Sequence, residues 1–234
     1  MQYEIMYNPS YSVARVQLDQ GEAIMAESGA MVSMSPSIKL DAQMAGGGLL
    51  GAIKSKIGGE SVFRTTFTAE SGPGEVVLAP SSTGDVLAIE LNGKMFVQGG
   101  SYLAGSTALE VGIEGSAKAM FSGEGLFLLT VSGTGVLFVS SFGAIHRITL
   151  QPGEEYIVDT SHMVAFDSTV TYKIEKATGK SEGVGGFIKG MVKSALSGEG
   201  LVCRYTGPGD VYIQTRSFQN FVQMLMPFLP TKSN

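Results

Sequence analysis

The sequence predicts an all-β protein: a pseudo-threefold repeat of antiparallel β-sandwich-like modules with short inserted helices and a C-terminal helix. Two observations carry this prediction. First, 32 of the 234 residues are glycine, interleaved with Val, Ile, Phe and Thr, which is typical of many short strands joined by tight turns. Second, one motif recurs three times: Gly-Gly-Glu or Ser-Gly-Glu, a strand-like run, a glycine-containing turn and another run. The copies begin at Gly58, Ser122 and Ser197.

A second repeated segment precedes each copy of this motif. It starts with a Leu before a glycine turn and continues as a strand, a small-residue turn and another strand. The three copies start near Leu18, Leu91 and Leu150. Repeats that cannot bury their strand faces alone must stack on their neighbours, so we expect one domain over 1–234. Its repeats are expected at about 1–88, 89–147 and 148–217, with a C-terminal helix at 217–227.

Alternating apolar and polar residues place the first strands near 2–7 and 12–18, separated by a turn at Asn8-Pro9-Ser10. In the motif copy at 121–141, we expect two short strands on either side of a turn at Gly133-Thr134-Gly135.

Two glycine-flanked segments, 46–60 and 185–199, predict short helices with an apolar stripe and neighbouring lysines. The stripe residues are Leu50, Ile53 and Ile57 in the first helix, and Phe187, Ile188, Met191 and Val192 in the second. Such stripes can cover the core, contact a partner subunit or rest on an anionic membrane surface. The helices are short and carry two lysines each, which favours burial over a membrane.

The C-terminal segment predicts a third helix. Ser217 is a suitable N-cap, and Pro227 ends the helix. Its apolar stripe consists of Phe218, Phe221, Val222 and Leu225.

The most suggestive set of polar residues is Glu60, Glu124 and Glu199, one in each motif copy. If a threefold axis brought them together, the like charges would raise at least one pKa or require a cation. Repeats also duplicate structural devices, and this favours a local backbone hydrogen bond for each glutamate. Ligand binding is the alternative.

A second candidate is the pair Asp159 and His162, three residues apart. It could form an acid–base dyad, but no motif supplies a nucleophile, so a partly buried, hydrogen-bonded His162 is favoured. The single cysteine, Cys203, lies in the apolar run LVCRY and is interpreted as a small buried hydrophobe. We predict no catalytic residues, no metal site and no cofactor.

The charge balance and the N-terminus narrow the class of protein further. A net charge of −5 makes nucleic acid an unfavoured partner. The N-terminus shows no basic segment followed by an apolar one, and no apolar run is long enough to span a bilayer. The expected location is the cytoplasm.

Six blocks of the sequence resemble the signature segments of one family. They are GEAIMAESGAMVSMSP, APSSTGDVLAIEL, FSGEGLFLLTVSGTG, SSFGAIH, YIVDTSHMVAF and SGEGLVCRYTGPGDVYIQTRS. From the first strand to Ser217, the chain resembles the prokaryotic branch of the altered-inheritance-of-mitochondria (mitochondrial biogenesis) family. The resemblance implies a fold like that of the tryptophan RNA-binding attenuation protein. It supplies no activity, catalytic residue or cofactor, and the likeness to an RNA-binding fold is analogy only.

The function expected from the sequence is a non-enzymatic scaffold or protein-interaction module that forms a homo-oligomer. One alternative is a small-ligand-binding protein or an unrecognised enzyme, with a pocket where the repeats meet. The other is a protein that associates with the membrane surface.

Overall fold

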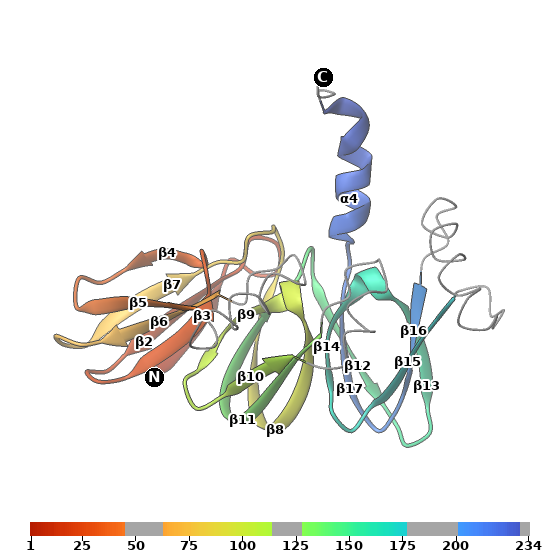
Figure 1. The fold of residues 1–234 in the computed structure, drawn as a ribbon, viewed down its shortest axis with the longest axis horizontal. Helices are drawn as coiled ribbons and strands as arrows, with labels where there is room; N and C mark the ends of the chain where they lie inside the picture. Colours follow the sequence, from red (N-terminus) through yellow and green to blue (C-terminus); the bar gives the residue numbers. More distant parts are fainter. Residues whose placement is uncertain (45–62, 114–127, 177–200, 230–234) are drawn as a thin grey trace.

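The computed structural model describes residues 1–44, 63–113, 128–176 and 201–229, and they form an elongated row of β-sheets (Figure 1). The strands are β1 (Gln2–Met6), β2 (Val13–Leu18), β3 (Ala23–Glu27), β4 (Met31–Met34), β5 (Ile38–Met44), β6 (Phe63–Ala69), β7 (Gly74–Leu78), β8 (Val86–Gln98), β9 (Tyr102–Ser106), β10 (Glu110–Ile113), β11 (Leu128–Ser140), β12 (Ile145–Leu150), β13 (Glu155–Asp159), β14 (Met163–Asp167), β15 (Thr171–Lys176), β16 (Leu201–Thr206) and β17 (Gly209–Gln214). One helix, α4 (Phe218–Leu225), and the 3-10 turns η1 (Gly99–Ser101), η2 (Thr160–His162) and η3 (Met226–Phe228) complete the described elements. The all-β prediction is confirmed.

The described strands form three sheets, and the strand pairs within them are antiparallel. The first sheet has the order β1-β2-β7-β4, and the last has the order β13-β16-β15. Between them runs a 10-stranded sheet with the order β12-β17-β14-β8-β11-β9-β3-β6-β5, with β10 paired to β11.

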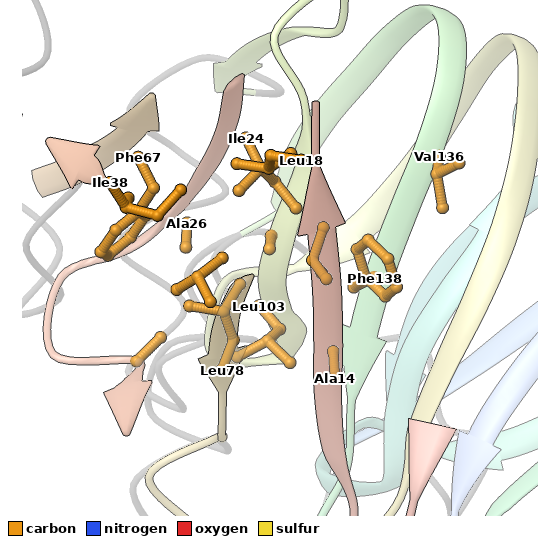
Figure 2. Packing of buried hydrophobic residues seen from close by; sticks show 14 of the residues in the cluster. Ala14, Leu18, Ile24, Ala26, Ile38, Phe67, Leu78, Leu103, Val136 and Phe138 are labelled. Atoms are coloured by element: carbon orange, nitrogen blue, oxygen red, sulfur yellow. The ribbon is translucent and has the colours of Figure 1, made fainter. Parts of the chain in front are cut away.

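Alternation of buried and exposed residues explains how these sheets pack. In β2 every second residue, Ala14, Val16 and Leu18, is buried. Period-two burial is what one face of a sheet against a core requires. Figure 2 shows the cluster that they join, in which side chains such as Ile24 and Phe67 gather between the strands that carry them.

Two long strands connect the three hydrophobic clusters of the described core. β8 contributes Val86 to the first cluster, Met95 to the second and Phe96 to the third. β11 contributes Phe138 to the first cluster, Leu137 to the second and Leu128 to the third. The three clusters therefore share two continuous strands. The boundaries of the three repeats stay a prediction.

The prediction of a turn at Gly133-Thr134-Gly135 is wrong. β11 runs without interruption from Leu128 to Ser140, and all 13 of its residues pair with β8. Gly133 lies opposite Gly93, and both have a positive φ, of 125° and 133° respectively. Glycine tolerates this backbone conformation without a Cβ clash. Here the glycines lie within a continuous strand pair, whereas the sequence pattern indicated that they would reverse the chain.

The predicted C-terminal helix is confirmed. α4 begins after Ser217, whose Oγ accepts a hydrogen bond from the backbone N–H of Asn220 at 3.2 Å. The chain then tightens into η3, which contains Pro227. The segments 46–60 and 185–199, with the stripe residues named above, lie outside the described residues. Within the described ranges, none of the helices combines the length and the apolar character needed to cross a bilayer.

Candidate functional site

The predicted polar candidates divide into two groups. Glu60, Glu124 and Glu199 lie outside the described residues. The structure describes Asp159 and His162, and each forms hydrogen bonds with different residues. Asp159 Oδ1 accepts hydrogen bonds from Ser161 N at 2.9 Å and Ser161 Oγ at 2.7 Å, which caps η2.

His162 is partly buried and hydrogen-bonded, as the favoured interpretation of the sequence has it. Its Nδ1 lies 2.7 Å from the carbonyl oxygen of Gln214, and the Gln214 side chain in turn donates to Ser161 O at 2.9 Å. These contacts tie η2 to the end of β17. The geometry therefore fits a structural role for His162, and the hydrogen bonds described above for these two residues do not join them to each other.

Cys203 is fully buried in the third hydrophobic cluster. Burial raises the pKa of its thiol to about 11, because a thiolate would lose its hydration there. The neighbouring Tyr205 is also buried, and burial raises the pKa of its phenol well above the usual value. A nucleophilic cysteine needs a lowered pKa and access to solvent, and Cys203 has neither.

The most conspicuous surface feature is α4, which projects from the body of the molecule (Figure 1). None of its residues is buried. Its exposed large apolar side chains, with those of the turn that follows, are Phe218, Phe221, Val222, Met224, Leu225, Met226, Phe228 and Leu229. No charged residue occurs between Ser217 and Pro230.

The base of α4 is nevertheless held in place. Ser217 is buried and caps the helix. The ring of Phe142, between β11 and β12, contacts the ring of Phe218 edge-on and that of Phe221 at a tilt, with ring centroids 5.9 and 5.4 Å apart. The helix is thus anchored at its first turn through Phe218 and Phe221, and Val222 and Leu225 of the same stripe stay exposed.

A second feature is a groove of about 740 Å³ that runs beside β8 from Leu87 to Met95. The volume lies within the range of roughly 300–1,000 Å³ that is usual for ligand pockets. Its apolar lining residues are Leu87, Ala88, Ile89, Leu91, Met95, Ile145 and Tyr212. Its charged lining residues are Asp85, Glu90, Lys94, Arg147, Asp167 and Asp210. The groove therefore combines an apolar lining with four carboxylates and two cationic side chains.

Three charged groups meet at the end of this groove where β14 stops. Arg147 Nη2 pairs with Asp210 Oδ2 at 2.5 Å, and Thr149 Oγ1 donates to Asp210 Oδ1 at 2.6 Å. Burial alone would raise the pKa of Asp210, but the hydrogen bonds from Arg147 and Thr149 outweigh it and lower that pKa.

The pKa of Asp167 shifts in the opposite direction to that of Asp210. Asp167 Oδ2 accepts a hydrogen bond from the backbone N–H of Asp210 at 2.8 Å, but burial dominates and raises the pKa of its carboxyl group. Among the described residues, no hydrogen bond reaches its other oxygen, Oδ1. Asp167 is therefore the carboxylate best placed to gain from a cationic group that enters the groove.

Sequence reasoning identified the apolar stripe of α4 but missed the groove. Its lining residues come from Asp85 and β8, from β12, from the end of β14 and the turn that follows, and from β17, so they span positions 85 to 212. No local motif marks them. Neither Asp159 nor His162 lines the groove, so their assignment to a ligand stays a prediction.

Comparisons with known proteins agree on the family and the fold. Residues 3–216 match the family described as mitochondrial biogenesis AIM24. An uncharacterised protein of Streptococcus pyogenes serotype M6 is 32% identical over 244 aligned residues, which cover 100% of this chain and 93% of that protein. The X-ray crystal structure of a Streptococcus pyogenes protein from a structural genomics consortium is similar with a TM-score of 0.78 and 28% identity. The match covers 97% of this chain and 99% of that one.

Proposed function

The chain belongs to the mitochondrial biogenesis AIM24 family, and we propose that it acts as a non-enzymatic protein-interaction module that self-associates through α4. The observation that carries the proposal is the exposed apolar stripe of α4, anchored at its base by Ser217 and Phe142. A helix this short is marginal in water by itself, because most helical stability in proteins comes from packing of an apolar face. The stripe therefore calls for a surface that covers it.

A second copy of the chain is the occupant that the chemistry favours. The stripe has no charge, so two copies can meet without repulsion or an unpaired buried ion. An anionic membrane is a poorer fit, because binding there normally uses lysines and arginines on the same helix. The net charge of −5 adds repulsion from such a surface. We include a cytoplasmic location in the proposal, since a single buried thiol suits a reducing compartment.

Sedimentation velocity of the full chain at several concentrations tests this proposal. Leu225→Glu places a charge in the stripe and is expected to shift the protein to the monomer. Gln223→Glu adds the same charge on the opposite side of the helix and serves as the matched control, so its oligomeric state should stay that of the wild type. A wild-type protein that is monomeric at every concentration overturns the proposal. Co-flotation of that monomer with phosphatidylglycerol vesicles would assign α4 to a membrane instead.

A further inference from the structure

The groove beside β8 follows the edge of a strand. Its lining includes every residue from Leu87 to Met95 in succession. A groove that ran over one face of β8 would be lined by alternate residues, because side chains alternate between the two faces of a strand. Uninterrupted lining means that backbone and side chains of both faces border the groove.

That edge of β8 has no strand partner over most of its length. β11 pairs with the other edge along all 13 residues, whereas β14 pairs with this edge only at Met95, Phe96 and Val97. From Val86 to Gly93, no described strand pairs with it. At the start of this stretch, Asp85 Oδ1 accepts a hydrogen bond from the N–H of Val86 at 2.9 Å.

The backbone groups that face the groove can be identified from the register. Lys94 O accepts a hydrogen bond from Ser168 N at 3.3 Å, so Lys94 directs its backbone toward this edge. The register with β11 is continuous, and antiparallel strands alternate the direction of their hydrogen-bonding groups. Ala88, Glu90 and Asn92 therefore present their N–H and C=O groups to the groove.

From this geometry we propose that the groove binds an extended peptide, which adds a strand to the free edge of β8 next to β14. Backbone hydrogen bonds to Ala88, Glu90 and Asn92 would hold the peptide, as in other cases where a peptide extends a sheet. The apolar side chains of Leu87, Ile89 and Leu91 belong to, or pack against, the second hydrophobic cluster. They favour apolar residues at alternate positions of the peptide.

The charges of the groove set the second requirement for the peptide. Its carboxylates outnumber its cationic side chains by four to two. Arg147 and Thr149 already bind Asp210, whereas Asp167 keeps one oxygen without a hydrogen bond from the described residues. The partner is therefore a peptide that alternates apolar and basic residues, with a lysine or arginine reaching Asp167.

The probe is an acetylated and amidated peptide of sequence Lys-Thr-Val-Lys-Val-Thr-Lys, titrated into the full chain by calorimetry. Two control peptides isolate the two requirements. In one, the central lysine and both valines are N-methylated on the backbone. In the other, glutamate replaces each lysine. N-methylation should weaken binding at least about tenfold, the scale expected from one or two lost hydrogen bonds. Replacement by glutamate should weaken it by a similar factor, because it brings like charges together in the groove.

Hydrogen exchange locates the bound peptide. The amides of Ala88, Glu90 and Asn92 should become protected on binding. Those of Ile89 and Leu91, which face β11, serve as the internal reference. Ala88→Pro removes one of the edge donors and should abolish binding. If Ala88→Pro does not fold, Asp167→Asn serves as the second variant, because it changes only a charge at the end of the groove. It should weaken peptide binding about fivefold through that lost charge.

The proposal is overturned if the probe does not bind, or if it binds without protecting these three amides. The proposal is also overturned if the N-methylated peptide binds as tightly as the unmodified probe. Leu225→Glu should leave peptide binding unchanged, because the groove and α4 are separate surfaces. Failure of self-association and failure of peptide binding are therefore distinguishable.

Discussion

At the scale of single residues, the buried thiol of Cys203 makes a direct prediction. Burial raises its pKa to about 11, so the thiol stays protonated in the folded protein at neutral pH. Iodoacetamide should therefore modify the native protein far more slowly than the protein unfolded in guanidinium chloride. Equal rates of modification at pH 8 would contradict the burial of this side chain.

The carboxylates of Asp167 and Asp210 should affect stability in opposite directions. The folded pKa of Asp210 is lowered, so its charge stabilises the fold above the unfolded pKa, and this contribution disappears as the pH falls. The folded pKa of Asp167 is raised, so its ionisation costs stability as the pH rises through the unfolded value.

Asp210→Asn should therefore lower the free energy of unfolding at pH 7 and have little effect at pH 3. Asp167→Asn should leave that free energy unchanged or increase it at pH 7. Urea denaturation at the two pH values measures both variants. A loss of stability at pH 7 in Asp167→Asn as large as that in Asp210→Asn would contradict the assignment.

At the scale of elements, the long pair of β8 and β11 depends on its glycines. Gly93 and Gly133 lie opposite each other and both have a positive φ, so an alanine at either position costs roughly 1–3 kcal/mol of backbone strain. A Cβ at Gly133 would also lie 2.8 Å from the carbonyl oxygen of Ala108, whereas a Cβ at Gly93 meets nothing within 4 Å.

Gly133→Ala should therefore destabilise the protein more than Gly93→Ala does. Chemical denaturation of the two variants gives the comparison, and each is the other's control. Equal losses of stability would show that the contact with Ala108 relaxes without cost.

The same glycines show where prediction from sequence reaches its limit. A positive φ at glycine serves a reversing turn or a bend within a strand equally well. Pairing of Gly133 with Gly93, 40 positions away in the chain, keeps the strand continuous. The start and end of α4 were predictable because the cap at Ser217 and the break at Pro227 act within one helical turn.

At the scale of the whole molecule, the alternation of apolar and polar residues was sufficient to predict an all-β chain, since burial with period two is a local property. The groove was not predictable in the same way. Leu87 and Asp167 line the same groove only because β14 pairs with the far end of β8, at residues 95–97. Its free strand edge follows from the short length of β14, which depends on tertiary structure.

The two surfaces proposed for interaction, the apolar stripe of α4 and the groove beside β8, are distinct. An unpaired strand edge is a site of aggregation when it is flat and open. Here the edge lies within a groove bordered by charged side chains, which admits a single strand more readily than another sheet. Self-association through α4 would place several such grooves in one assembly.

The most direct test of the central claim is a distance measured between two copies of α4. Because Cys203 is buried, a spin label attached to Gln223→Cys is selective for the helix. Pulsed dipolar spectroscopy of this singly labelled chain should give one defined intermolecular distance, and Leu225→Glu should abolish it. Absence of dipolar coupling at concentrations where the wild type sediments as an oligomer would show that α4 is not the contact between copies.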